Sequence, residues 1–226
     1  MSDLCLPAAG LLFDNDGVLV DSDASVQTAW SRWAREQGLD PDEVTAMVHG
    51  RRAADTVALL VPADRRQEAV ALVERLELED VGAVTAMPGA PELVAQLPAG
   101  TWAVVTSGVR ELATARLRAA GLPQPPVVIT AEDVAAGKPD PEGYASAASR
   151  LGLSPAALIV LEDAVSGVRA GQAAGCTVVG VGERALDSDA SVVVRNLVGA
   201  RWTAEGLLLP GAALLRAPGP APSCPR

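Results

Sequence analysis

Six short apolar runs recur along the chain and predict the strands of a buried sheet. They are GLLFD (10–14), WAVVTS (102–107), PVVIT (126–130), LIVLED (158–163), TVVGVG (177–182) and SVVVRN (191–196). Each is rich in Val, Ile or Leu without strict alternation, which is typical of parallel strands covered on both faces. Helical patterns lie between them, for example at 110–121 and 142–152, and both end at a glycine suited to a helix C-terminus. Repeated strand–helix units predict an α/β fold with a doubly wound, Rossmann-like parallel sheet.

The interval between the first and second runs breaks this rhythm. It contains no evident strand and reads as helices. In the stretch 21–38, Val26, Trp30 and Trp33 fall on one helical face, which predicts a packed core rather than a substrate platform. DPDE (40–43) resembles a capping box that opens a second helix, and 63–80 is a third helical stretch.

These patterns divide the chain into two parts. We expect a sheet core formed by residues 1–19 and 86–216, with a helical cap, residues 20–85, inserted after the first strand. The final segment, 217–226, is rich in proline and is expected to be disordered.

Composition and charge narrow the possible partners. The formal net charge is -10, which disfavours nucleic acid and anionic membranes but allows a small phosphorylated metabolite at a local positive site. The three cysteines, Cys5, Cys176 and Cys224, have no metal-ligand or disulfide-framework spacing. With no signal peptide and no membrane-length apolar run, the expected compartment is the cytoplasm. The oligomeric state is left open.

Polar residues follow several of the predicted strands. Asp14 and Asp16 follow the first run, Thr106, Ser107 and Gly108 follow the second, and Glu162 and Asp163 end LIVLED. Ligands of open parallel sheets bind beyond the carboxyl ends of the strands, so these groups are expected to meet at one rim.

Crowded carboxylates on this rim favour a cation. Asp14, Asp16 and Asp163 offer the hard oxygen ligands that Mg²⁺ prefers. Lys138, in GKPDP after the third run, is the only lysine of the chain. A compact ammonium can contact a carboxylate and a phosphate as a point charge, so Lys138 and the metal would attract a phosphoryl group.

The sequence here resembles a known family. DNDGVLVDS (14–22), the segment around Thr106, GKPDPEGY (137–144) and LEDAVSGVRAGQAAG (161–175) are similar, in order, to the four motifs of haloacid dehalogenase-like phosphohydrolases. The cap position resembles the subfamily with a helical cap. VHGRRAADTV (48–57) is similar to the glycerol-phosphate and deoxyglucose-phosphate phosphatases of that group.

The resemblance implies a role for each motif residue. Asp14 would be the nucleophile that takes the phosphoryl group, and Asp16 would be the general acid and base. Mg²⁺ would be held by Asp14, the Asp16 backbone carbonyl and Asp163, with Glu162 nearby. Thr106 and Lys138 would grip the phosphoryl oxygens, as would the backbone of Ser107 and Gly108.

The cap is expected to bring its densest polar turn, around His49 and Arg52, onto the other end of the substrate, with Asp55 as a further candidate. Arg51 is expected to face solvent, and Asp21 and Asp23 to serve the start of the cap. A surface role for His49 is the plainer alternative.

Three functions remain open on these observations. The leading one is a Mg²⁺-dependent phosphatase for a small sugar or polyol phosphate. A phosphosugar mutase has a similar build, but related mutases tend to carry a histidine in the first cap helix, where this chain has Val26 and Gln27. A phospho-receiver module, which does not turn over substrate, is shorter and lacks a helical insertion.

Overall fold

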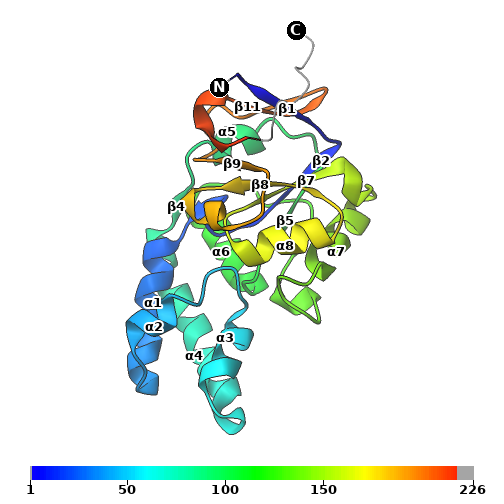
Figure 1. Ribbon diagram of the computed structural model, residues 1–226. Coiled ribbons are helices and arrows are strands. Elements are labelled where there is room, and N and C mark those ends of the chain that lie inside the picture. Colours follow the sequence, from blue (N-terminus) through cyan, green and yellow to red (C-terminus); the bar gives the residue numbers. More distant parts are fainter. Residues whose placement is uncertain (1, 218–226) are drawn as a thin grey trace.

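A seven-stranded sheet forms the centre of the protein in the computed structural model, which describes residues 2–217 (Figure 1). The strand order is β12-β9-β8-β7-β2-β5-β6, and all neighbours are parallel except β12 and β9. The strands are β2 (Gly10–Phe13), β5 (Trp102–Val105), β6 (Val128–Ile129), β7 (Leu158–Glu162), β8 (Thr177–Val181), β9 (Val192–Val194) and β12 (Leu214–Arg216). All six predicted runs therefore contain strands. The predicted tail 217–226 lies outside the described residues apart from its first residue.

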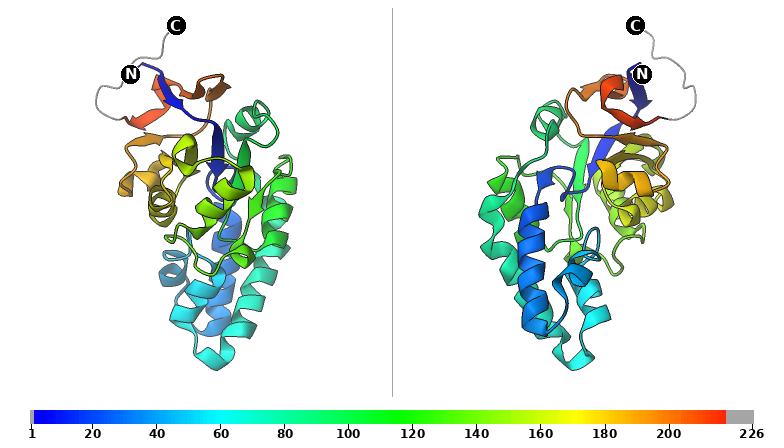
Figure 2. Two further views of the ribbon diagram at one scale, coloured as in Figure 1. Left: turned by 90° about the vertical axis from the view of Figure 1, so that its right-hand side faces the viewer. Right: turned by 60° about the vertical axis from the view of Figure 1, so that its left-hand side comes forward.

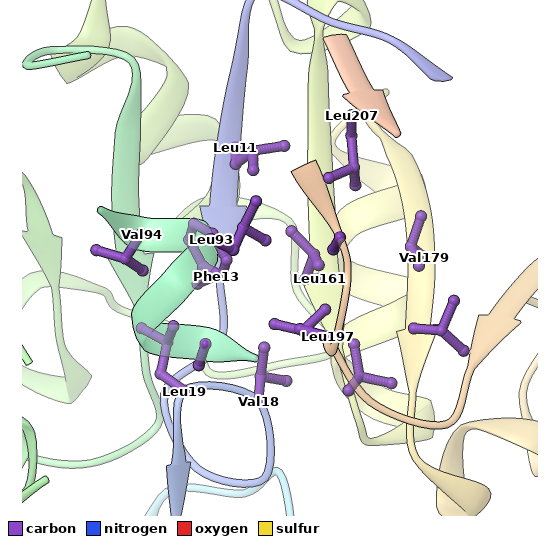
Figure 3. Packing of buried hydrophobic residues seen from close by; sticks show 14 of the residues in the cluster. Leu11, Phe13, Val18, Leu19, Leu93, Val94, Leu161, Val179, Leu197 and Leu207 are labelled. Carbon is purple, nitrogen blue, oxygen red and sulfur yellow. The ribbon is translucent and has the colours of Figure 1, made fainter. Parts of the chain in front are cut away.

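Helices cover both faces of this sheet. The core helices are α5 (Ala90–Val94), α6 (Arg110–Ala119), α7 (Glu142–Leu151) and α8 (Val165–Ala173). Successive residues of β2 point to opposite faces. Leu11 and Phe13 pack in one cluster with Leu93 and Val94 of α5 (Figure 3), whereas Leu12 packs in another with residues of α7 and α8. Burial on both faces explains why the strand runs do not alternate.

Glycines allow α8 to pack closely on the sheet. A Cβ atom on Gly171 would lie 2.9 Å from Val178, and one on Gly167 would overlap the Glu162 carboxylate. A larger residue at either position would push the helix away from the strands that carry the site.

A second, three-stranded antiparallel sheet lies at the end of the molecule where the chain begins (Figure 1). Its strands are β1 (Leu4–Pro7), β10 (Arg201–Thr203) and β11 (Gly206–Leu209). The sequence patterns did not predict this sheet or strand β12. These strands are three or four residues long, and so short a segment carries little periodicity.

Four helices form a separate body below the sheet (Figures 1 and 2). They are α1 (Asp23–Gln37), α2 (Pro41–Thr45), α3 (Ala53–Leu60) and α4 (Arg66–Glu79). Val26, Trp30 and Trp33 are buried in their common core, as their spacing predicted, and the two indole rings meet edge to face at 5.3 Å. The Asp40 carboxylate accepts the backbone N–H groups of Asp42 and Glu43, which caps α2.

The prediction that this interval contains no strand is wrong. β3 (Val20–Asp21) and β4 (Thr85–Ala86) pair antiparallel where the chain leaves the sheet and returns to it. Each has two residues, too few for a recognisable pattern. The pairing brings both ends of the helical insertion together.

Short 3₁₀ helices connect several of these elements. They are η1 (Ala63–Arg65), η2 (Val81–Ala83), η3 (Ala131–Asp133), η4 (Pro155–Ala157), η5 (Glu183–Asp187) and η6 (Gly211–Ala213). Within residues 2–217, no helix has both the length and the apolar character needed to cross a membrane.

Candidate active site

The carboxyl ends of β2, β5 and β7 bring the predicted motif residues to one cavity. Asp14 directly follows β2, Thr106 follows β5, and Glu162 ends β7. The cavity has a volume of about 220 Å³. Its lining includes Asp14, Asp16, Thr106, Ser107, Gly108 and Asp163 from the sheet core and His49 and Arg52 from the helical insertion. The structure therefore gathers residues that the sequence places up to 149 positions apart.

Lys138 lies at the centre of the buried charges. Its ammonium donates to Asp14 Oδ1 and Glu162 Oε1, each at 2.5 Å, and to the Val105 carbonyl at 3.1 Å. Its side chain is only 6% exposed. Burial opposes this charge, but the two carboxylates outweigh it and raise the pKa of Lys138. The Tyr144 hydroxyl also donates to Glu162 Oε1, at 2.9 Å. Lys138 therefore stays protonated beside Asp14.

Asp14, Glu162 and Asp163 form a buried carboxylate cluster. One oxygen of each lies within 4.8 Å of the others. Burial raises the pKa of Asp14 well above its usual value, and it raises the pKa of Asp163 to about 7, with the charge of Glu162 adding to both shifts. With all three ionised, the cluster carries more negative charge than Lys138 and Arg184 offset, and a divalent cation fits this donor set.

Within the cluster, Glu162 has several other partners. Its Oε1 accepts from Lys138 and Tyr144, and its Oε2 accepts the backbone N–H of Ala164 at 3.0 Å. It anchors Lys138, whereas Asp14 and Asp163 have oxygens that no other described donor takes. Asp14 and Asp163 are therefore the better side-chain candidates for a metal.

Asp16 lies at the mouth of the cluster, with its side chain 29% exposed. Its Oδ1 accepts from the Ser22 hydroxyl at 2.7 Å and from Arg116 Nη1 at 2.9 Å. Ser22 stands at the N-cap position of α1, but its hydroxyl makes no cap hydrogen bond. These two donors hold the Asp16 carboxylate on the cavity side.

Gly17 supplies the sharp turn that directly follows Asp16. Its φ is +82°, a conformation that side chains disfavour. A Cβ atom there would lie 2.3 Å from Asp163 Oδ2. Glycine is required here both for the turn and for the close approach to the Asp163 carboxylate, which follows β7.

The loop before α3 closes the cavity from the helical side. The Gly50 carbonyl accepts the hydroxyls of Ser107, at 3.3 Å, and Ser166, at 3.1 Å. Thr106 Oγ1 accepts the backbone N–H of Gly108 at 3.0 Å. Ser107 and Gly108 thus reach the predicted place, but the Ser107 hydroxyl and the Gly108 N–H already have partners within the protein.

His49 and Arg52 both line the cavity, with different surroundings. The His49 side chain is 35% exposed, and its Nδ1 lies 4.0 Å from Asp23 Oδ1. Arg52 donates to both oxygens of Asp55 and to the carbonyls of Val134 and Ala135. Its guanidinium therefore joins the helical part to the sheet core, and Asp55 is its partner. Arg51 is exposed, as predicted.

Three charged residues of the site escaped the sequence reasoning. Arg116 of α6 pairs with Glu77 of α4 at 3.1 Å, and both are buried. Arg184 binds Asp163 at 2.7 Å and Asp23 at 3.0 Å. The sequence held a weak signal for Arg116 alone, which follows Leu112 by four residues and so interrupts the apolar face of its helix.

Comparison with known proteins places the chain in a family. A model of the haloacid dehalogenase-like hydrolases matches residues 9–175. The chain therefore belongs to this family of hydrolases, and the predicted resemblance is confirmed.

Individual proteins are similar to this chain over most of its length. Hexitol phosphatase A of Escherichia coli (strain K12) is 45% identical over 177 residues, which cover 76% of this chain and 82% of that protein. Glycerol-1-phosphate phosphohydrolase 2 of Saccharomyces cerevisiae is 33% identical over 190 residues, 79% of this chain and 76% of that protein. The beta-phosphoglucomutase of Clostridium difficile has a similar fold, with a TM-score of 0.75 and 20% identity over 84% of this chain and 92% of that one.

Proposed function

We propose that this protein is a Mg²⁺-dependent phosphatase that hydrolyses a small sugar or polyol phosphate through an aspartyl-phosphate intermediate. The observation that carries the proposal is the Asp14 carboxylate at the end of β2, bonded to Lys138 and lining a cavity shared with the helical insertion. The two phosphatase relatives act on polyol phosphates, as their names state, and support this substrate class.

Asp14 attacks the phosphorus atom, and the bond from phosphorus to the alcohol oxygen breaks. Lys138 orients Asp14 for this attack through its 2.5 Å contact, and its charge favours the ionised form of Asp14. Thr106, at the end of the next strand, faces the same cavity and binds a phosphoryl oxygen. Asp16 gives a proton to the leaving alcohol and then accepts one from the water that hydrolyses the intermediate.

Asp14, the backbone carbonyl of Asp16 and Asp163 would hold the metal, with Glu162 behind them. When bound, Mg²⁺ supplies positive charge that favours the phosphoryl oxygens and offsets the carboxylates. The raised pKa values of Asp14 and Asp163 support this assignment, because both carboxylates need a further cation to be fully ionised at neutral pH.

A phosphosugar mutase is the alternative on the same fold. A mutase must keep water from the phosphorylated aspartate until the sugar phosphate has turned. Val26 of α1 lines the cavity here, and its side chain can neither donate nor accept a hydrogen bond. Val26 therefore cannot take the part of the histidine that related mutases tend to carry in the first cap helix, which favours hydrolysis over the mutase reaction. A receiver module is disfavoured by the helical insertion over the site.

Release of inorganic phosphate from glycerol and hexitol phosphates tests the proposal. We expect turnover that depends on added Mg²⁺ and is lost on Asp14→Asn, an isosteric change that removes the nucleophilic charge. Asp64→Asn, on the exposed η1 turn of the helical part, is the matched control and should keep wild-type turnover. Phosphate release that survives Asp14→Asn would exclude Asp14 as nucleophile, and an isomerised sugar phosphate without free phosphate would identify a mutase.

A further inference from the structure

A buried ion pair lies where α4 of the helical insertion meets α6 of the sheet core. Arg116 Nη2 donates to Glu77 Oε1 at 3.1 Å, and the two side chains are 4% and 9% exposed. Both residues line the same cavity as Asp14 and Thr106. The same lining includes the apolar side chain of Leu112 and the largely buried indole of Trp30, which also hydrogen-bonds to Glu77. The pair therefore faces the space that the leaving alcohol would fill.

Arg116 retains hydrogen-bonding capacity in this position. Its Nη1 donates to Asp16 and its Nη2 to Glu77, but its Nε–H is buried and has no partner among the described residues. A buried donor without an acceptor costs free energy. Nη1 and Nη2 each carry a second N–H group as well, and these can donate to a ligand in the adjoining cavity.

The chemistry of the pair matches a hydroxyl group. A guanidinium only donates hydrogen bonds and a carboxylate only accepts them, whereas a hydroxyl does both. Glu74 of the same helix also lines the cavity, so a second anionic group on the α4 side would meet two carboxylates, whereas Arg51 and Arg52 line the cavity from the loop before α3. The surroundings thus favour an uncharged, hydroxylated leaving group.

We propose that Arg116 and Glu77 bind hydroxyl groups of the leaving alcohol and select polyol phosphates over alkyl phosphates of the same length. This inference rests on the proposed phosphatase function. Because Arg116 also contacts Asp16, which serves the ester oxygen, the hydroxyls bound are those on carbons close to the ester.

The test compares two primary phosphate esters of three carbons, glycerol 1-phosphate and n-propyl phosphate. Their leaving alcohols are similarly basic, so a disturbance of Asp16 lowers both rates and largely cancels in the ratio of kcat/KM. For the wild-type enzyme we expect this ratio to be on the order of 100, the effect of hydrogen bonds to buried charged groups. Glu77→Gln should lower it about tenfold, chiefly through a higher KM for glycerol 1-phosphate.

Glu79→Gln is the matched control, because Glu79 lies on the same helix but is 46% exposed and pairs with Arg32 and Arg75. It should leave the ratio unchanged. If Glu77→Gln does not fold, the double variant Glu77→Leu/Arg116→Met replaces the buried pair by apolar groups of similar size, a change that proteins often tolerate. It should bring the ratio close to one.

The outcomes separate this inference from the function on which it rests. A wild-type enzyme that hydrolyses neither ester with Mg²⁺ would contradict the proposed function. A wild-type enzyme that hydrolyses both esters equally well would overturn only the role of Arg116 and Glu77. A folded Glu77→Gln or double variant that keeps the wild-type ratio would likewise overturn only the role of Arg116 and Glu77.

Discussion

Asp163→Asn is expected to stabilise the metal-free protein at neutral pH, although it removes a proposed metal ligand. In the folded protein, the burial of Asp163 and the nearby charge of Glu162 raise its pKa to about 7. The unfolded chain has an aspartate pKa of about 3.9. The folded state therefore binds the proton more tightly, so the contribution to stability is most favourable below about pH 4, falls as the pH rises to about 7, and stays low above that.

The size of this effect follows from the difference between the two pKa values. The two pKa values differ by about 3 units, and each unit corresponds to 1.36 kcal/mol. Above pH 7, the ionised Asp163 therefore lowers the free energy of unfolding by at most about 4 kcal/mol. At pH 5 the same reasoning leaves about 1–2 kcal/mol. Asparagine carries no charge, and its carbonyl oxygen can still accept from Arg184, which binds Asp163 at 2.7 Å. We expect Asp163→Asn to raise the free energy of unfolding by about 2–4 kcal/mol at pH 8.

Urea unfolding with a chelator present, at pH 5 and pH 8, measures this change. The gain at pH 5 should be less than half the gain at pH 8. Added Mg²⁺ should then stabilise the wild-type protein more than the variant, because a ligand stabilises the state that binds it. Asp23→Asn makes the same change at the other partner of Arg184 and serves as the control, because the Asp23 side chain is 54% exposed. A variant less stable than wild type at pH 8, or an equal gain at both pH values, would refute the reasoning.

Two further predictions concern the charges around Asp14. Lys138→Met leaves the carboxylates of Asp14 and Glu162 buried without their shared cation, so the free energy of unfolding should fall by about 3–5 kcal/mol in a urea titration, and an unchanged value would contradict the proposed pairing. Asp16→Asn should lower turnover of a polyol phosphate by a factor of at least about 100, whereas Asp23→Asn, on the exposed start of α1, should lower it by less than about threefold. Equal losses in a phosphate-release assay would show that the two acids do not differ in role.

The strands and the helical insertion were predictable because their signals are local. The first four residues of LIVLED are all apolar because β7 is buried on both faces, and this requirement is visible in consecutive residues. The Trp30 and Trp33 spacing is equally local, since it reflects one helical face. The strands β3, β4 and β12 were not predicted, because their pairing depends on partners elsewhere in the chain.

The site was predictable to the extent that strand ends determine it. Parallel strands end at one edge of the sheet, so Asp14, Thr106 and Asp163 had to meet once the sheet formed. The position of Lys138 did not follow from a strand end in the same way. It was proposed from its uniqueness in the composition and from the family resemblance, and the structure places its ammonium against Asp14.

The partners of the long polar side chains could not be predicted in this way. Arg52 was expected to meet substrate and does line the cavity, but its contacts with Asp55 and two backbone carbonyls were not predicted. Arg116 binds Asp16 across 100 residues and Glu77 across 39. A sequence pattern records which face of an element is apolar and which residues follow a strand, because burial and chain direction act locally. Which charged groups meet depends on how the helical insertion rests on the sheet, and only the tertiary structure contains that relation.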